Sequence, residues 1–182
     1  MIARFLALAA VAVIATRVPD LDGTLIDPLE PPGAAKATVL LFVSSTCPVS
    51  NRYAPDLRKL HDEYAKDSVS FWLIYPDPAD TVVDIRDHIR EFKFPGTALR
   101  DVKHELVKRA GATITPEAVV YDGRGRMTYR GRIDDRYTAV GIDKATPTRQ
   151  DLRDAIAATL AGKPIKDNRT QAVGCYIADF VR

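Results

Sequence analysis

The chain has 182 residues, of which 46% are hydrophobic and 27% are charged, with 26 basic residues against 24 acidic ones. These values are typical of one folded domain with a core of its own, and they exclude an intrinsically disordered chain. The basic residues are scattered rather than clustered, so no nucleic-acid partner is expected.

A short N-terminal segment that carries Arg4 is followed by an apolar stretch, Phe5 to Ala15. Its eleven residues are fewer than the roughly 20 that a membrane-spanning helix needs. A buried first helix would show a polar stripe, which this run lacks, whereas a basic residue, an apolar stretch and a small residue at the end are typical of a secretory signal peptide. We therefore expect residues 1–15 to be removed. The mature chain would be secreted or periplasmic, without a stable membrane span, in a compartment where disulfides persist.

The first half of the mature chain alternates between strand and helix patterns. A short hairpin is expected at 18–26, around Asp22-Gly23, and a Pro-rich loop at 27–36. Continuous apolar runs at 39–43 and 69–75 indicate buried strands. A helix that contains Pro55 is expected after Cys47. A second helix is expected at 82–92 and a short strand at 97–101.

The second half begins with a helix expected at 102–111. It continues with a hairpin whose strands are 118–121 and 127–133, and then a helix from an N-cap at Thr148 to Gly162. Residues 163–182 form a tail without clear periodicity until the stretch around Cys175. This order predicts one α/β domain over residues 16–162, with helices on both faces of a sheet whose first two long strands are parallel.

Cys47 is one of only two cysteines, and it lies between the strand at 39–43 and the following helix. Pro48 fits the first turn of that helix, so the thiol would meet unpaired N–H groups and the positive end of the helix dipole. Both favour the thiolate, and Ser50 can donate a further hydrogen bond from one turn on. The alternative is a small buried hydrophobe, but the position at a strand-to-helix junction favours a reactive thiol.

These residues resemble a known superfamily. The stretch "TCPVS", Pro55 eight positions after Cys47 and the downstream Thr115-Pro116 before a strand are together similar to the thioredoxin pattern. The helix and strand between Ala79 and Asp101, with the N-terminal hairpin, resemble the redoxin branch. That branch contains the alkyl hydroperoxide reductase/thiol-specific antioxidant proteins and secreted thioredoxin-like disulfide reductases.

The resemblance covers about residues 18–162 and implies a thioredoxin-like fold with a central mixed sheet flanked by helices. It also implies a cis Pro116 packed against the active cysteine, and activity as a thiol–disulfide oxidoreductase or a peroxiredoxin-like peroxidase. Two departures stand out. Ser50 replaces the second cysteine of a CxxC motif, so a local disulfide cannot form. Leu40 replaces the proline of the peroxidase pattern, although Ser44 matches its Ser or Thr.

The end of the second hairpin strand supplies candidate partners for the thiol. That strand runs antiparallel to the one that opens at Pro116, so Arg132, Asp134, Asp135 and Arg136 are expected near Cys47. Arg132 could stabilise the thiolate and orient a peroxide oxygen, and Asp134 could move protons. The alternative is a solvated loop of mutually paired charges.

Cys175 is the second cysteine, and two cysteines in an exported chain suggest a pair. It could be the resolving thiol for an oxidised Cys47, a permanent staple, or a thiol that faces a partner. Gly174 before it permits an unusual backbone turn. No metal or cofactor is expected, because the three histidines, His61, His88 and His104, are assigned to solvated positions.

Two functions remain open. In the first, an exported redox enzyme uses Cys47 as nucleophile toward thiol/disulfide proteins or small peroxides, and an external thiol reductant restores it. In the second, a catalytically silent module presents the Pro116 edge to a partner protein. A reactive Cys47 separates the two, because a scaffold needs no thiolate.

Overall fold

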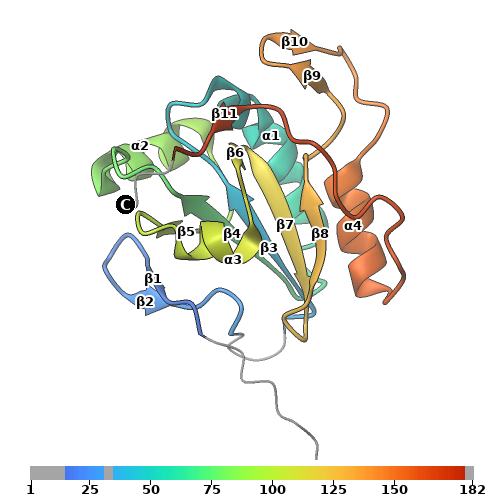
Figure 1. Ribbon diagram of the computed structural model, residues 1–182, viewed down its shortest axis with the longest axis horizontal. Helices are drawn as coiled ribbons and strands as arrows, with labels where there is room; N and C mark the ends of the chain where they lie inside the picture. The colour runs from blue at the N-terminus through green and yellow to red at the C-terminus, as the bar shows by residue number, and fades with distance from the viewer. Residues whose placement is uncertain (1–14, 31–34, 179–182) are drawn as a thin grey trace, which may run out of the picture.

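The computed structural model describes residues 15–30 and 35–178, and the predicted signal peptide lies outside them except for Ala15. Its centre is a five-stranded sheet in the order β5-β4-β3-β7-β8 (Figure 1). The strands are β3 (Ala37–Phe42), β4 (Val69–Tyr75), β5 (Thr97–Arg100), β7 (Glu117–Asp122) and β8 (Met127–Gly131). β3, β4 and β5 are mutually parallel, whereas β7 and β8 are antiparallel to their neighbours. The predicted mixed sheet and its parallel first pair are confirmed.

Helices cover both faces of the sheet, as expected for the fold. The helices are α1 (Pro48–Glu63), α2 (Val82–Phe92), α3 (Glu105–Ala110) and α4 (Asp151–Leu160). The first core cluster joins the sheet to α1, α2 and α4. The second joins it to α3 and to β1 (Val18–Pro19). β3 lies between the two cores and is buried along its whole length, which explains why its sequence is apolar except at Thr38.

Small pairings complete the structure. β1 pairs with β2 (Leu25–Ile26) in the predicted hairpin. Four pairings in the described residues were not foreseen, because elements of one to three residues have no readable periodicity. Two are formed by β9 (Tyr137–Ala139) with β10 (Ile142–Asp143) and by β6 (Ile114–Thr115) with β11 (Cys175–Tyr176). The other two are isolated bridges, Asp20 with Leu99 and Arg130 with Arg169. Residues 163–178, called the C-terminal segment below, thus run from α4 past β8 to β6 (Figure 1).

Two helix starts differ from the expectation. α4 begins at Asp151 with Gln150 as its N-cap residue, not at Thr148. Thr148 instead donates its N–H and hydroxyl to Asp135, at 2.7 and 2.5 Å. α3 begins only at Glu105, because Asp101 accepts the N–H groups of Glu105 and Val107 and so caps the helix from outside.

The solvated positions assigned to the histidines were wrong for two of them. His88 and His104 are 4% and 3% exposed. His104 Nε2 bonds the Pro76 carbonyl at 3.0 Å, and His88 bonds both Tyr75 and Asn51. The burial of His88 was readable from its spacing, because it lies three residues after the buried Ile85 on the same helix face.

Candidate functional site: a pair of thiols

Cys47 is the N-cap residue of α1, and Pro48 follows it in the first turn, as predicted. Among the described residues no side chain caps this helix in the thiol state, and its first turn contains no acidic residue. Helix starts usually recruit an oxygen acceptor for their unpaired N–H groups. Here the atom in the capping position is a sulfur. The free N–H groups and the helix dipole therefore favour negative charge on it.

The loop before Cys47, residues 43–46 and called the thiol loop below, is held from the side of α2. Ser45 donates its hydroxyl and its N–H to Asp80, which is buried. Asn51, on the first turns of α1, donates to the Ser45 carbonyl at 3.4 Å and is itself held by His88 Nε2 at 2.7 Å. The Tyr75 hydroxyl lies 2.9 Å from His88 Nδ1. These contacts join the loop, α1, α2 and β4 into one support for the thiol.

The Thr115-Pro116 edge faces Cys47 from the other side. The peptide bond between these two residues is cis. The Cys47 thiol donates to the Thr115 carbonyl at 3.1 Å. Cys175 lies directly opposite Thr115 in the antiparallel pairing of β11 with β6. The fold therefore brings Cys47, Thr115, Pro116 and Cys175 together at the edge where α1 begins.

The two thiols are free and polarise each other. Burial raises the pKa of Cys47, but hydrogen bonds from the Cys175 thiol and from the Ser50 N–H and hydroxyl outweigh it and leave that pKa below its ordinary value. Burial, the hydrogen bond to Cys47 and the negative charge of Cys47 raise the pKa of Cys175 to about 11. Cys47 is thus the better thiolate, and Cys175 keeps its proton.

Ser50 is fully buried at the end of the first turn of α1. While Cys47 is a thiol, the Ser50 hydroxyl has no hydrogen-bond partner in the described part of the chain. An unpaired buried hydroxyl costs about 1–3 kcal/mol. The same hydroxyl lowers the pKa of Cys47. It is therefore a donor in position for a thiolate.

Arg132 and Asp134 contact groups other than Cys47. Arg132 donates from Nε to Asp151 at 2.8 Å. Asp134 accepts the Tyr53 hydroxyl at 2.5 Å and the Arg136 N–H at 2.9 Å. These contacts favour a structural role, and the predicted action of Arg132 or Asp134 on the thiol stays a prediction.

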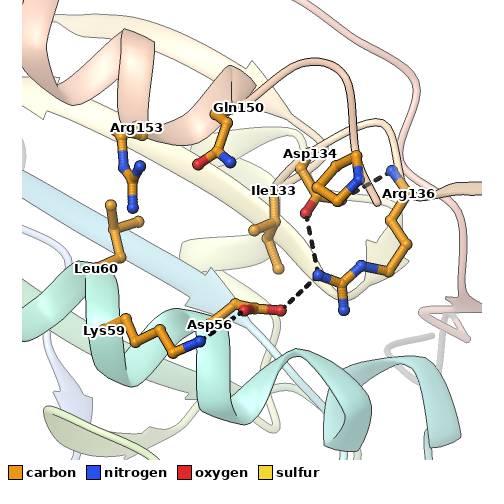
Figure 2. Close-up of a pocket in the computed structure, with 9 residues that line it drawn as sticks. Asp56, Lys59, Leu60, Ile133, Asp134, Arg136, Gln150 and Arg153 are labelled. Carbon is orange, nitrogen blue, oxygen red and sulfur yellow. Dashed lines mark hydrogen bonds and ion pairs between the residues drawn. The ribbon is translucent and has the colours of Figure 1, made fainter. Parts of the chain in front are cut away.

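A cavity of about 190 Å³ lies beside these charges, between α1, the start of α4 and the segment after β8. Figure 2 shows Arg136 bridging Asp56 and Asp134, with Lys59 beside Asp56. Arg153, at the far end, pairs with Glu63 at 3.0 Å. Neither cysteine lines this cavity, so we place the candidate site at the thiols and not here.

The sequence analysis missed the residues that support the thiol loop. Asp80 has no recognisable spacing to Cys47, and Asn51, although it lies one helical turn after Cys47, contacts Ser45 and His88, which only the packing of α2 on α1 brings together. Gly174 was noted for a different reason from the one observed. It is not among the glycines with positive φ. Instead, a Cβ added there would lie 2.0 Å from the Thr115 carbonyl oxygen, so only glycine lets the two backbones meet.

Comparisons with solved structures confirm the fold. An uncharacterized conserved protein from Geobacillus kaustophilus superposes with a TM-score of 0.75 at 25% identity, over 88% of this chain and 86% of that one. A hypothetical protein from Sinorhizobium meliloti gives 0.74 at 26% identity, over 89% of each chain. A secreted Mycobacterium tuberculosis disulfide oxidoreductase gives 0.55 at 20% identity, over 81% and 95%. That last likeness concerns the fold alone.

In the described residues no helix is long and apolar enough to span a membrane. The search of curated proteins found no match. The model of the AhpC/TSA family matches residues 12–130, which include Cys47, the thiol loop and the Thr115-Pro116 edge. With this match and the thioredoxin-like fold, the chain belongs to the AhpC/TSA family of redoxins.

Proposed function

We propose that this protein is an exported two-cysteine redox enzyme in which Cys47 is the nucleophile and Cys175 the resolving thiol. The observation that carries the proposal is the polarised thiol pair. The pKa of Cys47 lies below its ordinary value, that of Cys175 is raised to about 11, and the two thiols are hydrogen-bonded. A pair with this division of proton affinity is suited to attack by one sulfur and resolution by the other.

The reaction with a hydroperoxide proceeds in two balanced steps. The Cys47 thiolate attacks the terminal oxygen of ROOH, the O–O bond breaks, and the leaving alkoxide takes a proton to give ROH and a Cys47 sulfenic acid. The Cys175 sulfur then attacks the Cys47 sulfur, the S–O bond breaks, and water leaves with the Cys175 proton. The product is a Cys47–Cys175 disulfide, and two electrons have passed to the peroxide.

A small oxidant is favoured over a protein disulfide as the substrate. The side chain of Cys47 is 0% exposed, and β11 occupies the β6 edge beside it. A hydroperoxide needs only a small opening at Cys175, whereas an extended segment of a protein would have to displace β11. The pairing of β11 with β6 also weakens the alternative of a catalytically silent module that presents the Pro116 edge, because the chain covers that edge itself.

Export is part of the proposal. The apolar run at residues 5–15 supports a signal peptide, and one protein of similar fold is described as secreted. An exporting host that makes the protein should release a chain beginning near Thr16. Intact mass measurement of the mature protein checks this. A chain that still carries residues 1–15 would contradict it.

The central experiment treats fully reduced protein with one equivalent of hydrogen peroxide or of oxidised glutathione, at pH 5 to 9. Quenched samples are alkylated and mapped by mass spectrometry. We expect peroxide to convert wild type to the Cys47–Cys175 disulfide, and to do so faster than oxidised glutathione. Cys175→Ser should stop at a Cys47 sulfenic acid, which dimedone traps, and Cys47→Ser should not react.

Two results would overturn the proposal. The first is a Cys47 that labels with the pH profile of a free thiol and stays reduced in peroxide. The second is equal oxidation of the Cys47→Ser variant, which would make Cys175 the reactive thiol. If the protein reacts faster with oxidised glutathione than with peroxide, the assignment as a redox enzyme stands, but its substrate is a disulfide and not a peroxide.

A further inference from the structure

A buried carboxylate connects the N-terminal hairpin to the rest of the molecule. Asp27 follows β2, and its side chain is 2% exposed. Its Oδ1 accepts the Leu29 N–H at 2.9 Å. Its Oδ2 accepts the backbone N–H of Thr16 at 2.8 Å and lies 3.6 Å from Arg109 Nη1 on α3. The carboxylate thus holds the chain just before β1 against the chain just after β2 and against α3.

The position of Thr16 is fixed by further contacts. Arg109 Nη1 donates to the Thr16 hydroxyl at 3.0 Å. Val18, on β1, is 2% exposed and belongs to the second core cluster, which includes residues of α3. Asp20 forms a bridge with Leu99 of β5, so the hairpin lies at this edge of the sheet (Figure 1). The backbone nitrogen of Thr16 is therefore directed at Asp27 by the fold around it.

The Ala15–Thr16 peptide bond ends at this nitrogen. Ala15 is exposed and lines a surface pocket of about 270 Å³ together with Asp27 and Glu30. While the bond is intact, Thr16 N belongs to a neutral amide and offers Asp27 one N–H. Hydrolysis of the bond consumes one water and leaves a carboxylate on Ala15 and an ammonium group on Thr16. That ammonium group has three N–H donors and a positive charge.

A charged donor suits this position better than a neutral one. The Asp27 carboxylate is buried, and its cationic neighbour Arg109 lies at 3.6 Å, which is longer than a hydrogen bond. Hydrogen bonds with an ionised donor are roughly twice as strong as neutral ones. The Thr16 ammonium and the Arg109 guanidinium repel each other, which reduces the gain but does not cancel it, because the carboxylate lies between hydrogen-bond and ion-pair distance of both. The net effect is a modest stabilisation.

We propose that the export cleavage hydrolyses the Ala15–Thr16 bond and that the new Thr16 ammonium pairs with the Asp27 carboxylate, which holds the N-terminal hairpin against α3 in the mature chain. This inference rests on the exported part of the proposed function, because a host signal peptidase must cleave the bond. Cleavage one residue earlier leaves Thr16 N as an amide. Cleavage one residue later removes that nitrogen and the hydroxyl that Arg109 contacts. Processing at Thr16 therefore stabilises the folded protein, whereas the uncleaved chain lacks the ion pair.

The test compares two complete mature chains, residues 16–182 and residues 15–182, which differ only by Ala15. Each is released from an N-terminal fusion by a protease that leaves no extra residue, so the comparison does not depend on export. The ordinary pKa of an α-amino group is about 7.7–8.0, so the ammonium is charged at pH 6.5. At that pH the thermal midpoint of the chain that begins at Thr16 should be about 4 °C higher, because a charged hydrogen bond replaces a neutral one.

Two variants of both chains identify the partner of the ammonium. Asp27→Asn keeps the shape of the side chain and an acceptor oxygen but removes the charge, so the two chains should then have the same midpoint. Glu30→Gln is the matched control. Glu30 lines the same pocket, but its side chain is 67% exposed and its carboxylate is 3.7 Å from Arg17. The difference between the two Glu30→Gln chains should equal that between the unsubstituted chains.

The reactivity of the α-amine provides a second readout, which needs no folded variant. Both unsubstituted chains are treated with an acylating reagent at pH 7, and their N-terminal peptides are mapped by mass spectrometry. Acylation requires an amine that is deprotonated and accessible. The amine of Thr16 should therefore react about fivefold more slowly than that of the chain beginning at Ala15. The same reaction in urea gives the intrinsic rates of the two amines, and the difference should disappear there.

The outcomes separate this inference from the proposed function. Equal thermal midpoints, equal acylation rates in the folded chains, or a difference that persists in Asp27→Asn would overturn the ion pair and leave the redox function and export untouched. A mature chain that begins at another residue in an exporting host would overturn the position of the cleavage and leave export standing. Retention of residues 1–15 would contradict the exported part of the proposed function.

Discussion

The thiol site and the segment between β8 and α4 both collect polar groups, but they differ in how these groups are paired. At the thiol site the Ser50 hydroxyl is buried without a partner, and the start of α1 has no oxygen acceptor among the described residues. In the segment after β8, the buried carboxylates of Asp134 and Asp135 each accept several hydrogen bonds, although Arg136 Nε and the Tyr137 hydroxyl have no partner among the described residues. An open donor beside a nucleophilic sulfur indicates a place for a charge that forms during a reaction, whereas carboxylates that are already paired indicate structure.

The largest expected effect is a loss of stability on substitution of Asp135, in the segment after β8. Asp135 accepts hydrogen bonds from Lys144, Thr148 and Arg149, at 2.5–2.9 Å. Asp135→Ala leaves these donors unpaired, so the free energy of unfolding should fall by about 3 kcal/mol. Urea denaturation measures the loss. The pH profile of Cys47 alkylation should stay as in wild type, and a shifted profile would break the separation of the two regions.

His88 connects pH to the support of the thiol loop. Burial lowers its pKa to about 4 from the ordinary value of 6.5. The unfolded state binds the proton of His88 more readily than the folded state does. Neutral His88 therefore stabilises the folded protein fully above about pH 6.5, and this stabilisation is lost as the pH falls toward 4. The loss should amount to roughly 3 kcal/mol.

Urea denaturation of wild type and His88→Gln between pH 4 and 7.5 measures this contribution. The difference between the two proteins should shrink as the pH falls. Burial raises the pKa of Asp80, so its contribution to stability changes with pH in the opposite direction. That contribution is the same in both proteins and cancels in the difference. A constant difference across that range would show that His88 is protonated in the folded protein near its ordinary pKa.

Ser50→Ala tests the thiol site, where the Ser50 hydroxyl has no partner among the described residues. Loss of a hydrogen bond of about 1.5 kcal/mol to the thiolate lowers its population about tenfold, and the higher intrinsic nucleophilicity of a more basic sulfur recovers part of this. The rate of Cys47 alkylation at pH 7 should therefore fall about threefold. The free energy of unfolding should be unchanged or up to about 1 kcal/mol higher, because an unpaired buried hydroxyl is removed. A marked loss of stability would mean that Ser50 has a structural partner.

The smallest expected effect belongs to Arg132. Its guanidinium is paired with Asp151 at 2.8 Å. Arg132→Ala should therefore leave the rate and pH profile of Cys47 alkylation within about twofold of wild type, apart from the salt dependence of a distant charge. Stopped-flow alkylation at low and high salt provides the measurement. A tenfold slower reaction would restore the sequence-based prediction that Arg132 stabilises the thiolate.

Much of the fold was predictable, since its long elements carry their own periodicity. The apolar runs of β3 and β4 and the spacing of Tyr53, Leu57 and Leu60 on α1 depend on local geometry and burial alone. The short pairings of β6, β9, β10 and β11 were not predictable, because two or three residues show no period. The burial of His88 was readable but overlooked, since a histidine on an apolar helix face was treated as polar.

At the thiol site, local sequence was enough to identify Cys47, Pro48 and Ser50. Their relation follows from one turn of helix, and helix geometry is set by the spacing of residues along the chain. The meeting of Cys175 with Cys47, and the other contacts of Arg132 and Asp134, became visible only in the folded chain. The close contact of the Gly174 and Thr115 backbones and the anchoring of Thr170 depend on the path of the C-terminal segment across the sheet. That path is set by packing between distant residues, and no local pattern encodes it.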